Sequence, residues 1–317
     1  MSEPLLQVKN LKKYFRSAKG TVHAVDDVSF TLEAGKTLGV VGESGCGKST
    51  LGRTIIRLQE PTAGSVLFNG RDVSTLNNRQ LWEQRREMQM IFQDPFSSLN
   101  PRMTISQAIE EPLTLYHMCP DKTSRQKRVA ELMDTVGLAR RLYNTYPHEL
   151  DGGRRQRIGI ARALALEPSF IVCDEPVSAL DVSIQAQILN LMQDLQEELH
   201  LTYLFITHDL SVVYHISDEI MVMYLGQVIE KAPAETLFNN PVHPYTQALL
   251  SAIPIPSLHN RKERVLMTGE LTSPIDPPAE CRFANRCRYA TDRCRQGEPK
   301  LHEIEPGHFV SCFMCES

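Results

Sequence analysis

The sequence contains no long apolar run and no excess of basic residues, and each absence excludes a class of protein. No apolar stretch approaches the roughly 18 residues that a membrane-spanning helix needs. The opening residues, MSEPLLQVKN, lack the basic segment and apolar run of a secretory signal peptide. The formal net charge is −4, so the chain as a whole is not a nucleic-acid-binding polycation. We therefore expect a protein that is soluble, or peripheral to a membrane through its partners.

Internal repeats and low-complexity tracts are also missing, whereas the composition is that of a folded protein. The 317 residues are 42% hydrophobic and 23% charged, which is enough for a large core and more than one domain. Five of the eight cysteines crowd the C-terminal part of the chain. Without a secretion signal, such crowding favours a metal site over a disulfide framework. The five are Cys281, Cys287, Cys294, Cys312 and Cys315.

The pattern of apolar segments predicts an α/β fold. LLQVKNL, AVDDVSFTL, TLGVVG and SVLFNG predict early strands separated by turn residues. SRQKRVAELMDTVGL predicts a helix that stops at Gly137. FIVCDEP, LTYLFITHD and EIMVMYLGQVIE predict buried strands, and the helical stretch SIQAQILNLMQDLQEEL lies between the first two. The order strand, helix, strand implies a parallel sheet.

Residues 42–50, GESGCGKST, fit the phosphate-binding pattern G-x-x-x-x-G-K-[ST] between an apolar run and a potential helix. Glycines let backbone N–H groups curl around phosphate oxygens, and the helix N-terminus adds partial positive charge. We expect Lys48 to reach the β and γ phosphates and Ser49 to bind Mg²⁺. Chance matches arise about once in a hundred chains of this length. The predicted nucleotide-binding residues are Gly42, Glu43, Ser44, Gly45, Cys46, Gly47, Lys48, Ser49 and Thr50.

The apolar segment FIVCDE, residues 170–175, ends in two carboxylates. Asp174 at a strand end suits Mg²⁺ coordination, usually through water. Glu175 is placed to polarise an attacking water. An acidic turn after a buried strand is common by itself, but beside a phosphate loop it predicts the catalytic half of an ATPase.

The order of these motifs resembles that of ABC-type ATPases: GESGCGKST, MIFQDP, LDGGRRQR, FIVCDE, SALD and ITHD run from about residue 35 to residue 210. The resemblance implies a RecA-like core with antiparallel β and α-helical subdomains. It places the nucleotide domain at 1–240, with the helical subdomain at about 86–160. It implies that Gln93 binds Mg²⁺, senses the attacking water and connects to a membrane partner. It also implies that His208, which in isolation would be a structural histidine, contacts the γ phosphate.

Further roles follow from the same resemblance. Phe15 takes the place of the aromatic that stacks on adenine, with Tyr14 as the alternative. Residues 178–181 form the loop at the subunit interface. The family assembles head to tail, so that each ATP lies between the phosphate loop of one subunit and the signature loop of the other. The signature residues Asp151, Gly152 and Gly153 are therefore expected at the partner's nucleotide.

Asp151 departs from the serine that the family usually has there. Aspartate caps a helix as well as serine does, so the fold should tolerate it. An ionised carboxylate at roughly 4 Å from a phosphate charge would cost on the order of 4 kcal/mol at an effective dielectric of about 20. Either one ATP site is naturally degenerate, or the carboxylate binds protonated, or the residue is a variant that blocks closure. We favour a weakened site.

The C-terminal part, 241–317, resembles the dipeptide/oligopeptide permease family, closest to its F-type ATPase subunit. NNPVHPYTQALLSAIP (239–254) and GELTSPIDPPAECRFANRC (269–287) carry this resemblance. It implies an ATPase at the cytoplasmic face of the membrane that energises di- or oligopeptide import. Its partners would be a second, different ABC ATPase, two transmembrane permease subunits and, indirectly, an extracytoplasmic peptide-binding protein, with no nucleic acid. The alternatives are a soluble ABC ATPase with a metal-containing, nucleic-acid-binding tail, and an exporter ATPase.

The cysteine spacing C-x5-C-x6-C-x17-C-x2-C suits Zn²⁺ or an iron–sulfur cluster. By resemblance the ligands are Cys281, Cys287, Cys294 and Cys312, with a [4Fe–4S] cluster favoured, Zn²⁺ as the alternative and Cys315 a free thiol. Four buried, reduced cysteines are the plainer alternative. A tail with so few apolar residues is expected to need a bound metal ion or cluster in order to fold. Five arginines within residues 281–295 predict a solvated basic face, or a surface for the other ATPase or lipid headgroups. They are Arg282, Arg286, Arg288, Arg293 and Arg295.

Overall fold

The computed structural model describes residues 4–253, 267, 269 and 273–315. The chain forms two compact units. The first, here the N/C unit, combines residues 1–75 with residues 205–317, and the second, the middle unit, spans residues 76–204. Parts of the segments NNPVHPYTQALLSAIP (239–254) and GELTSPIDPPAECRFANRC (269–287) lie outside the described residues.

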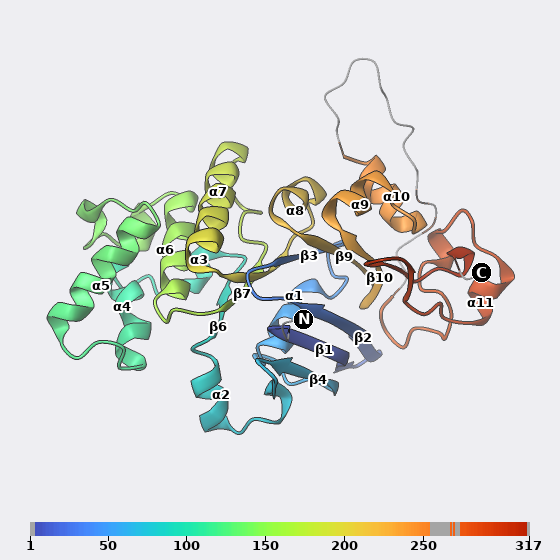
Figure 1. Ribbon diagram of the computed structural model, residues 1–317, viewed down its shortest axis with the longest axis horizontal. Helices are drawn as coiled ribbons and strands as arrows, with labels where there is room; N and C mark the ends of the chain where they lie inside the picture. Colours follow the sequence, from blue (N-terminus) through green and yellow to red (C-terminus); the bar gives the residue numbers. More distant parts are fainter. Residues whose placement is uncertain (1–3, 254–266, 268, 270–272, 316–317) are drawn as a thin grey trace, which may run out of the picture. The chain divides into compact units, whose positions relative to one another are not determined.

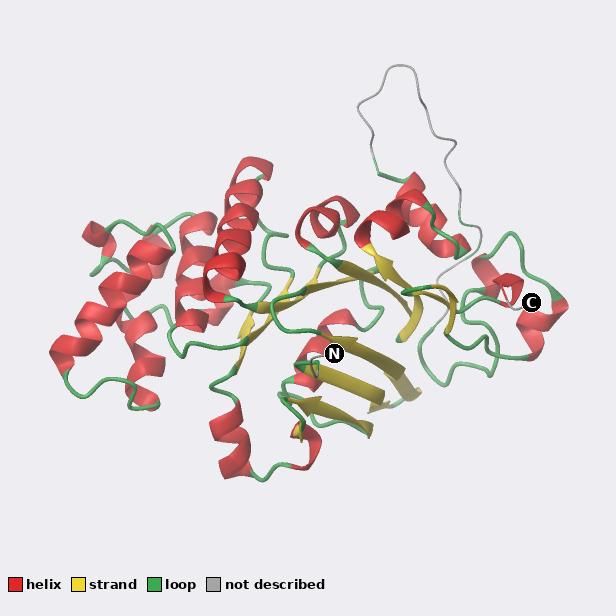
Figure 2. Ribbon diagram, in the orientation of Figure 1, coloured by secondary structure: helices red, strands yellow, loops and turns green. Residues whose placement is uncertain are grey.

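The N/C unit contains a four-stranded antiparallel sheet in the order β2-β1-β4-β5. Figure 2 draws its strands in yellow. The turn Asn69-Gly70, with both φ angles positive, joins the last two strands, as expected for a tight hairpin. The early strands therefore form where the apolar segments predicted them. The bounds are β1 (Leu6–Ser17), β2 (Gly20–Leu32), β4 (Ala63–Phe68) and β5 (Arg71–Asp72).

The core sheet of the N/C unit is mixed. β3 pairs in parallel with β9, and β9 pairs antiparallel with β10. A turn at Leu225-Gly226 divides the segment EIMVMYLGQVIE into these last two strands. A C-terminal hairpin, β11–β12, then extends the sheet through β10. The bounds are β3 (Thr37–Val41), β9 (Glu219–Tyr224), β10 (Gln227–Pro233), β11 (His302–Glu305) and β12 (His308–Val310).

The helices of the N/C unit are short. The main ones are α1 (Lys48–Ile55), α8 (Leu210–Ile216), α9 (Ala234–Asn239), α10 (Pro244–Ser251) and α11 (Asp292–Gln296). Single 3₁₀ turns are η1 (Val73–Thr75), η4 (Ala284–Arg286) and η5 (Phe313–Cys315). β8 (Thr202–Ile206) crosses the residue boundary between the units.

The middle unit is mainly helical, and α4, α5 and α6 pack against one another in it (Figure 1). Two strands, β6 (Met88–Ile91), which the sequence did not predict, and β7 (Phe170–Asp174), pair in parallel. The predicted helix before Gly137 is α5, and Gly137 follows it with φ +68°. The helices are α2 (Asn78–Gln84), α3 (Pro95–Ser98), α4 (Ile105–Leu115), α5 (Lys122–Thr135), α6 (Gly152–Leu164) and α7 (Val182–Leu199), with 3₁₀ turns η2 (Arg140–Leu142) and η3 (Pro147–Glu149).

Buried strands form the core. All residues of β3, β7 and β8 are buried, which agrees with their near-continuous apolar sequences. Among the described helices, none combines the length and the hydropathy that crossing a membrane requires.

Candidate functional site

The loop of residues 42–50, here called the phosphate loop, joins β3 to α1 and depends on its glycines. Gly42, Gly45 and Gly47 have φ angles of +153°, +80° and +107°. A Cβ at Gly47 would lie 1.9 Å from the Ala24 carbonyl oxygen, and one at Gly42 would lie 2.2 Å from the Met223 carbonyl oxygen. Only glycine fits these two positions, because both the backbone conformation and the neighbouring carbonyls exclude a side chain.

Lys48 begins α1 and lies within the curl of the phosphate loop. Its ammonium group donates hydrogen bonds to the carbonyl oxygens of Gly42, at 2.8 Å, and Glu43, at 3.0 Å. The side chain is almost fully buried. The residues that the motif predicted therefore converge on one tight loop with a cation at its centre, followed by Ser49 and Thr50 in the first turn of α1.

Two aromatic residues near the end of β1 differ in their surroundings. The Tyr14 ring stacks on His23 at a centroid distance of 4.0 Å, and its hydroxyl is hydrogen-bonded to Asp26. The Phe15 ring is partly exposed, with the Lys13 ammonium 4.7 Å from its centroid. The Phe15 ring is therefore exposed enough to contact a ligand, whereas the Tyr14 ring is already stacked on His23.

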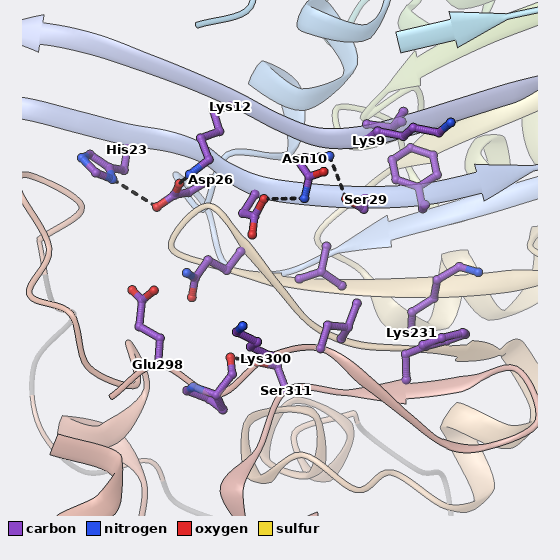
Figure 3. A pocket seen from close by; sticks show the side chains of 18 of the residues that line it. Lys9, Asn10, Lys12, His23, Asp26, Ser29, Lys231, Glu298, Lys300 and Ser311 are labelled. Carbon is purple, nitrogen blue, oxygen red and sulfur yellow. Dashed lines mark hydrogen bonds and ion pairs between the residues drawn. The ribbon is translucent and has the colours of Figure 1, made fainter. Parts of the chain in front are cut away.

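Asp26 lies at one end of a groove of about 910 Å³ in the N/C unit (Figure 3). Figure 3 shows His23 and Lys12 pointing toward its carboxylate, and Arg282 pairs with it as well. Burial acts to raise the pKa of the Asp26 carboxyl, but hydrogen bonds from Tyr14 and His23 and the charge of Arg282 lower it to about 2. The Asp26 carboxyl group is therefore ionised, and it is paired with side chains of the same unit.

In the middle unit, Gln93 and Glu175 come together. The Gln93 side-chain amide donates a hydrogen bond of 3.0 Å to a carboxylate oxygen of Glu175. Asp174, fully buried, ends β7, and Glu175 follows with a left-handed φ of +47°. A left-handed non-glycine residue directly after a buried strand is the kind of backbone strain that clusters at functional sites.

The signature residues open α6 in the same unit. Asp151 is the N-cap, and its carboxylate accepts a hydrogen bond of 2.8 Å from the Arg154 backbone N–H. The helix-capping role that the sequence predicted is therefore confirmed. The Arg154 guanidinium also lies 3.3 Å from the carboxylate, a neighbour that the sequence argument did not consider. A Cβ at Gly153 would lie 2.5 Å from a methyl group of Ile184, so this glycine permits close packing against α7.

The remaining predicted residues lie in turns after buried segments. His208 is exposed two residues after β8, and the preceding Thr207 N–H donates to the Val40 carbonyl of β3. The stretch 178–181 lies before α7, and both the backbone N–H and the hydroxyl of Ser178 donate to the Glu175 carbonyl oxygen.

The C-terminal thiols are neighbours. The Cys281 backbone N–H donates to the Cys294 carbonyl oxygen at 2.9 Å. Burial, together with the nearby thiols of Cys294, Cys312 and Cys287, raises the pKa of the Cys281 thiol to about 11, although a hydrogen bond with the Phe283 backbone acts to lower it. Nevertheless, within the described part of the chain no three His, Cys, Asp or Glu side chains are arranged to hold a metal ion. The thiol donor set suits a cluster, whereas this arrangement of it gives no support to the expected [4Fe–4S] or Zn²⁺ site.

The expectation that the tail arginines form a solvated basic face is wrong for two of them. Arg282 is buried against Asp26, and Arg286 forms a two-point ion pair with Glu43 of the phosphate loop. Sequence reasoning missed both contacts because the partners lie 256 and 243 residues away. It also missed Tyr245, whose hydroxyl oxygen accepts a hydrogen bond of 2.9 Å from the Glu43 N–H. The segment HPYT had marked this position only as part of a family resemblance.

Comparison with known proteins places these features in a family. The ABC transporter family model matches residues 25–178, and the model described as the C-terminal region of oligopeptide/dipeptide transporters matches residues 229–294. The oligopeptide transport ATP-binding protein AppF of Bacillus subtilis is 52% identical, over 98% of this chain and 98% of its own length. The dipeptide transport ATP-binding protein DppF of Haemophilus influenzae is 52% identical, over 98% and 96%. A solved structure, the ATP-binding cassette MJ0796 in a dimeric post-hydrolysis state with ADP and Pi, superposes with a TM-score of 0.67 at 31% identity, covering 72% of this chain and 98% of that one.

Proposed function

This chain belongs to the ATP-binding subunits of ABC transporters, in the oligopeptide/dipeptide branch, and from that membership we propose that it hydrolyses ATP to energise the import of di- or oligopeptides. The observation that carries the proposal is the phosphate loop, with Lys48 held at its centre by two loop carbonyl groups. The names of the relatives, oligopeptide and dipeptide transport ATP-binding proteins, support the solute class.

In the proposed binding mode, the phosphate loop and Lys48 hold the β and γ phosphates of ATP. Phe15 stacks on adenine, because its ring is partly exposed while Tyr14 is occupied by His23 and Asp26. Ser49, Gln93 and, through water, Asp174 are the proposed ligands of the Mg²⁺ ion. When bound, Mg²⁺ would neutralise part of the phosphate charge.

Glu175 is the proposed general base, and His208 the proposed contact of the γ phosphate. The hydrogen bond from Gln93 to Glu175 supports this role, because it orients the carboxylate that must accept a proton from the attacking water. The left-handed backbone at Glu175 holds the carboxylate directly after the strand end. Beyond this proton acceptor, hydrolysis needs positioning and charge stabilisation from the protein.

The proposed assembly is that of a binding-protein-dependent importer. We propose a second, different ATPase as the head-to-tail partner, with Asp151, Gly152 and Gly153 at the partner's nucleotide. Two permease subunits would hold the pair at the cytoplasmic face of the membrane, and an extracytoplasmic protein would deliver the peptide. The dimeric state of the MJ0796 cassette supports pairing of such subunits. Within the chain, we propose a nucleotide domain at 1–240 with its helical part at about 86–160, and a permease-type C-terminal region at 241–317.

We further propose that Cys281, Cys287, Cys294 and Cys312 hold a [4Fe–4S] cluster, with Zn²⁺ as the alternative metal. The chemistry of the donor set, four thiols, is what suits such a group, although the described side chains are not arranged to hold a metal ion. Metal binding would require the thiols to lose their protons and move into a tetrahedral arrangement. Its contribution would be to fold stability rather than to ATP chemistry.

The alternative of a nucleic-acid-binding tail is not supported. Arg282 and Arg286, which such a tail would direct at phosphate groups, are paired with Asp26 and Glu43. The relatives are transport ATP-binding proteins.

Two substitutions test the ATPase assignment. Lys48→Ala should weaken ATP binding by about 100-fold, because it removes a charged hydrogen-bond donor to phosphate. Glu175→Gln should leave ATP binding intact but lower turnover about 100-fold or more, because it removes only the proton acceptor. Binding is measured with fluorescent mant-ATP, and turnover in the assembled transporter.

The matched control for the second substitution is Glu198→Gln at the exposed end of α7. It makes the same chemical change away from the strand end, so turnover should equal that of the wild type. If Glu175→Gln hydrolyses ATP at the wild-type rate, the assigned base is wrong.

A further inference from the structure

The seven residues CRFANRC, 281–287, form a loop, here called the latch loop, whose two arginines both contact the nucleotide-binding part of the N/C unit. The side chains of Arg282 and Arg286 are only 4% and 11% exposed. Between them, Phe283 is buried and packs edge-on against Tyr224 and Tyr245, with ring centroids at 5.3 and 5.5 Å. The aromatic packing fixes the loop, so that the two guanidinium groups have defined positions.

Arg286 binds Glu43 in the geometry of a fork. Its two terminal nitrogens lie 2.8 and 3.0 Å from the two carboxylate oxygens. The hydrogen bond to Glu43 is the main cause that raises the pKa of the Arg286 guanidinium above its ordinary value. A bidentate pair between a planar cation and a carboxylate is the strongest and most directional form of ion pair in proteins.

Glu43 is the second residue of the phosphate loop and is held at three points. Its N–H donates to Tyr245, its carbonyl oxygen accepts from Lys48, and its carboxylate binds Arg286. Two of the three contacts come from residues after 240. The conformation of the loop that receives phosphate is therefore fixed in part by the C-terminal region.

Arg282 supports the other side of the same loop. It donates to the carbonyl oxygen of Leu225 in the β9–β10 turn, and it pairs with Asp26. The next residue of that turn, Gly226, donates its N–H to the carbonyl oxygen of Cys46 in the phosphate loop at 2.8 Å. The latch loop thus contacts the phosphate loop directly through Arg286 and indirectly through Arg282.

We propose that the latch loop is a positioning device for ATP binding, in which Arg286 preorders the phosphate loop by holding Glu43. Two physical effects follow from the pair. A loop that is already in its binding conformation loses less conformational entropy when phosphate binds. The guanidinium also compensates the Glu43 carboxylate, which would otherwise repel the phosphate charges from within the loop.

The inference rests on the proposed function, since it assumes that ATP binds the phosphate loop. It adds a requirement from residues outside the nucleotide-binding motifs. A residue that only positions the binding loop improves ground-state and transition-state binding alike, so its loss raises KM and leaves kcat nearly unchanged. A residue in the chemical step would lower kcat instead.

The test measures mant-ATP affinity and steady-state ATPase kinetics on the full chain. Arg286→Ala should raise the Kd for mant-ATP about 10-fold and raise KM in parallel, with kcat within about twofold of the wild type. Arg286→Lys should raise Kd about threefold, because an ammonium group keeps the charge but not the fork. In the Arg286→Ala background, Glu43→Gln should recover part of the affinity, because it removes the uncompensated charge.

Arg288→Ala is the matched control. Arg288 lies one residue beyond the latch loop and contacts Tyr289 rather than the phosphate loop, so its loss should leave Kd unchanged. If Arg286→Ala does not fold, the Kd for mant-ATP is measured for Arg286→Lys and for Glu43→Gln as single substitutions. A Kd within about 1.5-fold of the wild type for both variants overturns the proposal. A folded Arg286→Ala variant with wild-type Kd overturns it directly. If the wild type did not bind mant-ATP, the proposed function would be overturned, and so would the proposed role of the latch loop.

Discussion

At the scale of single residues, Asp151 combines a structural role with a chemical conflict. Its carboxylate caps α6 through the Arg154 N–H, so the helix start is well formed. The proposed head-to-tail assembly would bring the same carboxylate near the partner's γ phosphate, where serine is usual. Arg154, 3.3 Å away, offsets part of that negative charge. We therefore expect a weakened site rather than a blocked one.

We predict that Asp151→Ser raises ATPase activity and ATP-driven dimerisation roughly 10-fold, because it removes a like charge and supplies a hydroxyl donor. Asp151→Asn should recover only part of the gain, because it keeps the helix cap and removes the charge but does not supply the hydroxyl. Activity and sedimentation of the purified subunit measure both effects.

Asp121→Ser is the control for this prediction. Asp121 is also an N-cap aspartate in the middle unit, accepting from the Ser124 N–H at 2.8 Å, but it lies at α5. Its substitution should change neither activity nor dimerisation. Equal behaviour of the wild type and of the Asp151→Asn and Asp151→Ser variants would mean that Asp151 is a helix cap alone.

At the scale of elements, the C-terminal tail is held by more than its thiols. The β11–β12 hairpin extends the core sheet through the pairing of Glu230 with Val310 and of Lys231 with Phe309. Glu230, fully buried, also accepts hydrogen bonds from the backbone N–H groups of Val242 and His243 and pairs with His308. The hairpin is therefore anchored without a metal ion.

We predict that anaerobically purified protein contains iron and sulfide and absorbs visible light, and that Cys287→Ser abolishes both signals. Because β12 stays paired to β10, proteolysis of this variant should concentrate between residues 288 and 300 and spare the hairpin. Elemental analysis, an absorption spectrum and limited proteolysis make the measurements.

Cys119→Ser, outside the tail, should leave metal content and cleavage unchanged. Colourless wild-type protein with one equivalent of zinc and no iron would contradict the iron–sulfur assignment. Protein with neither metal would leave four reduced thiols as the correct description.

Local sequence signals predicted the elements whose determinants are local. The strands before and after the phosphate loop, the α5 stop at Gly137 and the Asp151 cap all follow from residues within a few positions of one another. β11 and β12 could not be predicted, because they carry few apolar residues and are stabilised by pairing with β10. The Arg286–Glu43 pair could not be predicted either, because its partners are 243 residues apart and no local pattern links them.

At the scale of the whole molecule, the N/C unit depends on a buried neutral histidine. His243 caps α10, and its ring nitrogen accepts a hydrogen bond from the Tyr245 N–H. Burial lowers the pKa of His243 to about 3. Protonation would remove the acceptor at the start of the helix that carries Tyr245 to the phosphate loop.

We predict that the free energy of unfolding falls as the pH falls below about 6.5, the ordinary pKa of histidine in the unfolded chain. The folded pKa is the lower one, so the unfolded state binds the extra proton and the stability present at pH 7 is lost progressively toward about pH 3. The loss from His243 should be about 2 kcal/mol at pH 5 relative to pH 7. Urea titrations at several pH values measure it.

His243→Asn keeps a capping side chain and removes the titration. The contribution of His243 is the difference between the two proteins in how the free energy of unfolding depends on pH. Parallel curves for the two proteins would show that His243 does not govern the acid response.

The discontinuous N/C unit has a consequence for how the protein is made. Glu43 leaves the ribosome 243 residues before Arg286, which at about 5–20 residues per second is an interval of roughly 12 to 50 s. During that interval the phosphate loop exists without the latch loop, so the growing chain should bind ATP weakly until synthesis is nearly finished. Stalled nascent chains of increasing length should show a final rise in mant-ATP affinity, of about 10-fold, once residue 286 has emerged. The order of residues along the chain would then delay tight ATP binding until the subunit is almost completely synthesised.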